Sequence, residues 1–309
     1  MQKSGDKSLF PYVAGLVAAA VYTTVSFVTP QNPNATNYGL SAGDIRLLIL
    51  SLLIPIFIIW MLAIYSSLGV SRYATLLRET KEGGNFRRFA DGVLILVFSL
   101  IVGSMISAFN SAMVQLGAGA GWRILSEYVA VFLPLVAFFQ IFRGSQSLVR
   151  ANQHKSLRRN RQAAALIAVV MTAVYALTLF GNSYRSDTPD INKFSSYFLP
   201  DWLIILTIVL PYGITWLLGL LATTNIMEYR LRVKGVIYRQ AFSSLAIGLA
   251  TVVVVSIMGQ FLTAVGPALA AMGLSGILGI VYFLLLIIAV GYGFLARGAR
   301  QLSKIEEVA

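Results

Sequence analysis

Residues 47–69 read LLILSLLIPIFIIWMLAIYSSLG, and residues 203–225 read LIILTIVLPYGITWLLGLLATTN. Each stretch is apolar over the roughly 20 residues that a helix needs to span a bilayer. Each also carries one internal proline, and Pro211 lies 156 residues after Pro55. Because proline lacks an N–H and its ring presses on the carbonyl four residues back, both stretches predict a kinked membrane helix.

Two further positions match when the prolines are superposed. Trp60 falls on Trp216, and Ser51 falls on Thr207, so a hydroxyl stands four residues before each proline. A nearby hydroxyl is one means by which a membrane helix satisfies a freed backbone group. The prolines and hydroxyl residues are therefore candidate hinge residues, with static kinks as the alternative. Both tryptophans fall toward one end of their helices, where an aromatic belt is expected at the membrane surface.

The composition is that of a polytopic membrane protein. Of the 309 residues, 57% are hydrophobic and only 12% are charged, whereas charged residues usually make up about a quarter of a soluble domain. The chain has no cysteine and one histidine, His154. Disulfides, thiolate or multi-histidine metal sites, iron–sulfur clusters and bis-histidine haem are thereby excluded, and we expect no metal and no cofactor.

Eight apolar runs are expected to cross the membrane. The predicted fold is an all-α integral membrane bundle of eight transmembrane helices. The first run is longer than the apolar region of a signal peptide, so we expect it to be retained. The glycine-rich segment 117–121 is expected to turn the chain between the third and fourth helices. The runs lie at residues 9–29, 46–68, 92–115, 123–142, 162–181, 198–225, 240–265 and 276–297.

Lysine and arginine gather on one side of these spans. When the loops are assigned alternately, 20 of the 24 basic residues fall on the side of the two termini. The other four are Arg46, Arg123, Arg185 and Lys193. The positive-inside rule then predicts cytoplasmic termini, and the short loops suggest a prokaryotic plasma (inner) membrane. This topology explains the net charge of +12, so we expect contact with anionic lipid headgroups and no binding of nucleic acid.

The two halves of the chain match in the same order. Beyond the proline-containing helices, Val21, Tyr22 and Phe27 match Val174, Tyr175 and Phe180 at an offset of 153 residues. Phe109 and Ala112 match Phe261 and Ala264 at an offset of 152. Arg143-Gly144 matches Arg297-Gly298 at an offset of 154. We therefore predict four-helix repeats at 1–145 and 162–299, a basic cytoplasmic linker at 146–161 and a cytoplasmic tail at 300–309. Because each repeat has an even number of spans, the repeats should be parallel and related by an axis along the membrane normal.

Three polar residues within the spans are candidates for lining a path. Asn110 lies in the third span, Gln260 in the seventh, and Glu127 in the fourth, four residues after Arg123. Glu127 is the only acidic residue that we expect within a span. The alternative is that these side chains join neighbouring helices, or that Glu127 pairs with Arg123 near the membrane surface.

Three functional hypotheses follow. The first is a structural or interaction subunit without catalytic chemistry, which assembles with partner proteins, with copies of itself or with lipids. The second is a transporter or channel-like protein with its path between the repeats. Because no predicted span carries a Lys, Asp, Glu or His near its midpoint, we do not expect ion or proton coupling. The third is a membrane enzyme, with Glu127, Asp44, Asp187 and Asp190 as its acids, but we assign no catalytic residue.

Overall fold

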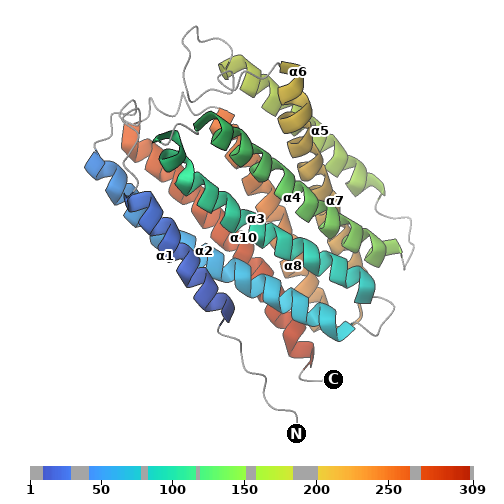
Figure 1. The fold of residues 1–309 in the computed structure, drawn as a ribbon. Coiled ribbons are helices and arrows are strands. Elements are labelled where there is room, and N and C mark those ends of the chain that lie inside the picture. Colours follow the sequence, from blue (N-terminus) through green and yellow to red (C-terminus); the bar gives the residue numbers. More distant parts are fainter. Residues whose placement is uncertain are drawn as a thin grey trace.

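The computed structural model describes residues 10–28, 42–77, 83–115, 119–150, 158–183, 201–264 and 273–306, and nearly all of them are helical. The helices are α1 (Phe10–Val28), α2 (Ala42–Leu76), α3 (Gly83–Gln115), α4 (Gly119–Arg150), α5 (Arg158–Ser183), α6 (Asp201–Ile204), the π-helix η5 (Ile205–Val209), α7 (Leu210–Arg232), α8 (Val236–Ala264) and α10 (Gly273–Glu306) (Figure 1). The predicted all-α class is confirmed. Seven of the described helical stretches are long and apolar enough to cross a membrane, and α1 is an apolar helix of 19 residues.

Several helices are longer than the predicted spans. α2, α3, α4 and α10 contain 35, 33, 32 and 34 residues. Helices of this length measure about 50 Å, against roughly 30 Å for the hydrocarbon core of a bilayer. Exposed arginines such as Arg72, Arg87, Arg143 and Arg297 lie on the additional turns. We call this side the basic end of the bundle, where α2, α4, α7 and α10 end and α3, α5 and α8 begin.

Six helices pack in a closed order around the centre of the bundle. α2 contacts α3, α3 contacts α4, α4 contacts α7, α7 contacts α8, α8 contacts α10, and α10 returns to α2. α1 packs mainly on α2, and α5 packs mainly on α7. Figure 1 shows α1 and α5 at opposite edges of the bundle. These two helices therefore lie outside the central six.

The core contains two buried tryptophans. Trp60 of α2 and Trp216 of α7 are 1% and 0% exposed, so the expectation of an aromatic belt is wrong for both. Each indole instead makes an edge-to-face contact with a tyrosine of an outer helix. The ring centroids of Trp60 and Tyr22 are 5.9 Å apart, and those of Trp216 and Tyr175 are 5.7 Å apart. The tryptophans thus attach α1 and α5 to the central helices through a favourable ring geometry.

Glycines let α3 and α4 approach closely toward the basic end. A Cβ atom on Gly144 would lie 2.5 Å from the backbone nitrogen of Phe89 and 2.9 Å from the carbonyl oxygen of Asn85. A Cβ atom on Gly92 would lie 2.6 Å from Ile141. Since lipid gives helices no hydrophobic reason to associate, close van der Waals contact through small residues is a main source of attraction between them.

We predict that Gly144→Ala destabilises the bundle by about 1–3 kcal/mol, because the α3 backbone would have to move. The measurement is the thermal unfolding midpoint of the purified protein in mild detergent. Gly293→Ala is the matched control, since no described atom lies within 4 Å of its added Cβ, and alanine favours a helix over glycine. Equal midpoints for the two variants would contradict close packing at Gly144.

Candidate functional site

The two prolines lie in different backbone environments. Pro55 is inside the continuous helix α2. Pro211 is buried near the start of α7, and only Leu210 separates it from the π-helix Ile205–Val209. There the Leu210 N–H donates to the carbonyl of Ile205, five residues back. A π-turn widens the helix locally and is frequent at functional sites, so the second copy differs from the first at the matched proline.

The hydroxyl near the second proline bonds to the backbone of its own helix. Thr207 Oγ1 donates to the carbonyl oxygen of Leu203 at 2.7 Å, one turn earlier in the helix. The π-helix Ile205–Val209 lies beside this hydroxyl and ends just before Pro211. Ser51 lies on the exposed side of α2. The hinge role of these residues stays a prediction.

The other candidate residues lie on three different helices. Asn110 belongs to α3 and Glu127 to α4, but their side chains are outside the described part of the structure. Gln260 is partly buried on α8. The path role of these residues stays a prediction too. Glu127 is not the only acidic residue in a candidate span, because Asp91 lies in Gly84–Ile106 and Glu228 in Trp202–Arg232.

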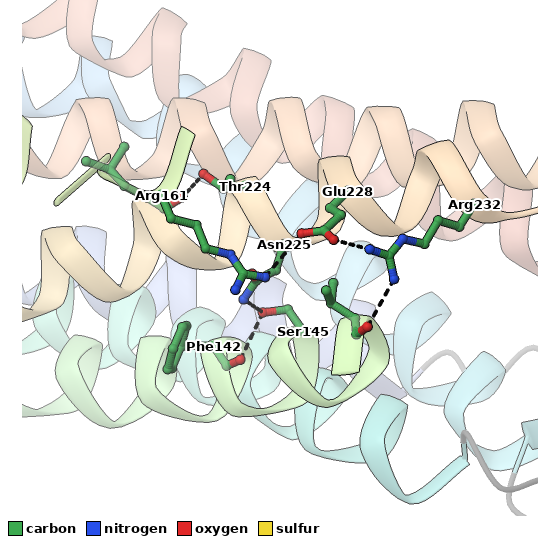
Figure 2. A network of polar contacts seen from close by, with 9 residues as sticks. Phe142, Ser145, Arg161, Thr224, Asn225, Glu228 and Arg232 are labelled. Atoms are coloured by element: carbon green, nitrogen blue, oxygen red, sulfur yellow. Dashed lines mark hydrogen bonds and ion pairs between the residues drawn. The ribbon is translucent and has the colours of Figure 1, made fainter. Parts of the chain in front are cut away.

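Glu228 is the buried charge that sequence reasoning missed. It is 3% exposed and lies on α7, which continues beyond residue 225, where the predicted span ended. Arg161 Nη2 of α5 donates to one carboxylate oxygen at 3.1 Å, and Arg232 Nη2 donates to the other. Figure 2 shows the two guanidinium groups on opposite sides of the carboxylate. Both oxygens of Glu228 therefore have a cationic partner.

The contacts extend from α7 to α4. Arg232 Nη1 donates to the carbonyl oxygen of Val149 at 3.1 Å. Two turns of α7 before Arg232, Asn225 Nδ2 donates to Ser145 Oγ at 3.3 Å, and that hydroxyl donates to the carbonyl of Phe142 at 2.9 Å. We call Ser145, Arg161, Asn225, Glu228 and Arg232 the Glu228 network (Figure 2). It joins the basic ends of α4, α5 and α7.

The chemistry of the Glu228 network is that of a structural contact. A buried carboxylate is costly unless it is paired and hydrogen-bonded, and here both guanidinium groups meet that need. Since both carboxylate oxygens already accept from arginine, Glu228 is poorly placed to act as a general base. Within the described ranges, no group of three or more His, Cys, Asp or Glu side chains could hold a metal ion.

One signal for this network was present in the sequence. Glu228 and Arg232 have the i,i+4 spacing of a helical ion pair, which would have suggested that α7 continues. Arg161 lies 67 residues earlier in the chain. Its contact depends on the packing of α5 against α7 and leaves no sequence pattern.

The chain matches no known protein-family model, no curated protein and no solved structure. The class that its fold defines is a polytopic helical membrane protein, on the length and apolarity of the described helices.

We predict that Glu228→Gln destabilises the protein by about 2 kcal/mol. Breaking a buried ion pair costs about 3–5 kcal/mol, and we discount this because the Arg161 side chain is 39% exposed and partly screened by solvent. Thermal unfolding in mild detergent measures the effect. Arg161→Gln should cost less, and Arg159→Gln, an exposed position on the same helix, is the control. A midpoint for Glu228→Gln equal to that of the control would show that the network contributes nothing.

Proposed function

We propose that this chain is a structural subunit of a membrane assembly, built from two parallel four-helix repeats and without catalytic chemistry of its own. The proposal has three parts: the duplication, the orientation in the membrane, and the role as a subunit. Each is supported by different contacts.

The duplication is supported by ring pairs at matched positions. Tyr73 of α2 and Phe86 of α3 have centroids 4.9 Å apart and planes at 84°. Tyr229 of α7 and Phe242 of α8 have centroids 4.8 Å apart and planes at 82°. Each residue of the second pair lies 156 residues after its counterpart. The tyrosine–tryptophan pairs of the outer helices also have nearly equal geometry, with interplanar angles of 73° and 72°.

Close helix approaches recur with the same spacing. Gly92 of α3 meets Ile141 of α4, and Gly248 of α8 meets Leu295 of α10. Gly248 again lies 156 residues after Gly92, whereas the sequence match between Phe109 and Phe261 used an offset of 152. The difference is about one helical turn. The contacts favour 156 for this pair of helices.

A direct contact between matched residues supports an axis relating the halves. The rings of Phe86 and Phe242 meet edge to face with centroids 6.3 Å apart. When equivalent residues of two similar units touch each other, the contact is isologous and implies a two-fold axis between them. Both residues lie near the start of their helices, α3 and α8, at the basic end. This arrangement favours parallel repeats over inverted ones.

The orientation is supported by the position of the charges. The exposed arginines gather at one end of the described helices, and Figure 1 shows the start of α1 and the end of α10 on that side. By the positive-inside rule this end faces the cytoplasm. We therefore propose a multi-pass protein of the plasma or inner membrane with both termini cytoplasmic.

The subunit role rests on how the proposed halves are joined. Asn225 of α7 bonds to Ser145 at the end of the first proposed half, and Arg232 bonds to Val149 of the predicted linker, which continues α4. The other boundary brings α10 against α2, where a Cβ on Gly69 would be 2.7 Å from the Cβ of Ala299. Alternating access by rocking would have to break both boundaries. Such a bundle is suited to a rigid scaffold, with the exposed faces of α1 and α5 left for lipids, partner proteins or a second copy.

A transporter or channel-like protein is the second candidate, because one matched pair of glycines has open space beside it. Gly103 of α3 and Gly259 of α8 lie 156 residues apart, and no described atom lies within 4 Å of a Cβ added to either. Their neighbours Ser104 and Gln260, also 156 residues apart, are partly buried. A path between the halves would need such matched open positions, and Pro55 and Pro211 would be its hinges.

The orientation can be tested with single cysteines, because the natural chain has none. We predict that a membrane-impermeant maleimide labels Arg159→Cys only after the cells are permeabilised. Ser186→Cys, in the segment predicted to be extracytoplasmic, should be labelled in intact cells. The opposite pattern would overturn the proposed orientation.

One reconstitution experiment separates the two functions. For a subunit, we predict that proteoliposomes take up small neutral solutes no faster than protein-free vesicles. We also predict that membranes solubilised in mild detergent yield a particle whose protein mass, without the bound detergent, exceeds the 33.6 kDa of one chain. For the second candidate, at least one solute enters faster, and Gln260→Leu slows it while Gly293→Ala does not. A monomer that conducts would refute the subunit, and a monomer that does not conduct would refute both.

A further inference from the structure

A polar cavity opens between α2 and α3 at the basic end of the bundle. Its volume is about 340 Å³, and Gly84 forms part of its wall without a side chain to fill it. The hydroxyl residues Ser71 and Thr75 line the α2 side, and the charged residues Arg87 and Asp91 line the α3 side. The cavity lies outside the Glu228 network, and no residue of it was a candidate from the sequence.

The exposed residues of α3 place this cavity at the level of the lipid headgroups. Arg87, Arg88 and Asp91 are exposed. The next exposed residues along the helix are Leu94 and Phe98, whose exposed fractions are 50% and 57%. This change from charged to apolar marks the boundary between the headgroup region and the hydrocarbon core. A molecule in the cavity would therefore lie beside the polar part of a phospholipid.

The charges of the cavity have opposite signs and share one face of α3. Arg87 and Asp91 are one turn apart, about 6 Å along the helix axis. In the described part of the chain, neither side chain forms an ion pair with another residue. Both side chains are exposed, so the charged groups of a lipid headgroup can reach them. A ligand with an amine and a phosphate would supply a partner for each charge.

We propose that this cavity binds a phospholipid with an amine-bearing headgroup, of the phosphatidylethanolamine class. The phosphate pairs with Arg87 and the ammonium with Asp91, while the acyl chains lie along Leu94 and Phe98. A purely anionic headgroup could pair with Arg87 but would be repelled by Asp91. The inference requires that the chain spans a membrane, but not that it is a subunit rather than a transporter.

The second half of the chain lacks the same pair of charges. The positions 156 residues after Arg87 and Asp91 are Ser243 and Ile247 on α8. The proposed site is therefore present once per chain, and the corresponding region of the other half provides an internal comparison.

The test uses protein reconstituted in vesicles of equal parts phosphatidylethanolamine and phosphatidylglycerol, then extracted in mild detergent and analysed for retained lipid by native mass spectrometry. We predict that the natural chain retains phosphatidylethanolamine over phosphatidylglycerol by about three- to fivefold, the size expected for an exposed ion contact. Asp91→Asn should abolish this preference, because the ammonium loses its partner. Arg87→Gln should lower the retention of both lipids.

Arg88→Gln is the matched control, since it removes an exposed arginine of α3 that does not line the cavity. All four proteins should unfold at similar temperatures, which separates loss of lipid from loss of fold. Preference for phosphatidylglycerol in the natural chain, or an unchanged preference in Asp91→Asn, would overturn the site. If soluble phosphoethanolamine displaces the retained lipid as well as the intact lipid does, the headgroup alone is the ligand and the lipid assignment is wrong. Failure of the subunit proposal would appear in the reconstitution experiment and leave these results unaffected.

Discussion

Packing at the centre of the bundle is the constraint on which the remaining contacts depend, because lipid offers two helices no hydrophobic reason to associate. Near the basic end, the rings of Phe86 of α3 and Phe242 of α8 meet with centroids 6.3 Å apart. The contacts of α2 with α10 and of α4 with α7 lie on either side and complete the closed order of six helices. Bulkier residues at these contacts would separate the helices, which explains why small residues such as Gly69 and Ser145 are found there.

The sequence predicted the elements of the fold better than their ends or their contacts. Apolar length identified the helices, since lipid-facing helices need uninterrupted apolar runs. It did not locate their ends, because a helix can continue into water on charged residues, as α7 does through Glu228 to Arg232. The sequence match aligned α3 with α8 at an offset of 152 residues, whereas the contacts of Phe242 and Gly248 favour an offset of 156. A shift of one turn leaves nearly the same face of an apolar helix buried, so hydropathy cannot detect it.

The candidate residues were harder to predict than the helices, for a related physical reason. Trp60 and Trp216 were placed at the membrane surface from their position along the helix, but their burial depends on which face the neighbouring helix covers. Asp91 was missed because its span was started one residue too late, and Arg161 meets Glu228 only after α5 has packed on α7. Spacing along one helix can predict a local pair, whereas a contact between helices requires their arrangement.

Matched contacts between the proposed halves differ in chemistry, because one is apolar and the other is polar. The polar contact lies where burying charge costs least. Gly69 and Ala299 meet by van der Waals contact alone. Their counterparts in the other half are Asn225, which lies 156 residues after Gly69, and Ser145, which lies 154 residues before Ala299. These two counterparts form a hydrogen bond. Glu228 is bound beside that pair, on the turns nearest the basic end. Near the middle of the bilayer the same carboxylate and its two arginines would lose their access to water, at a cost of several kcal/mol. At the basic end Arg161 remains 39% exposed, so the charged network is tolerated where the apolar band ends.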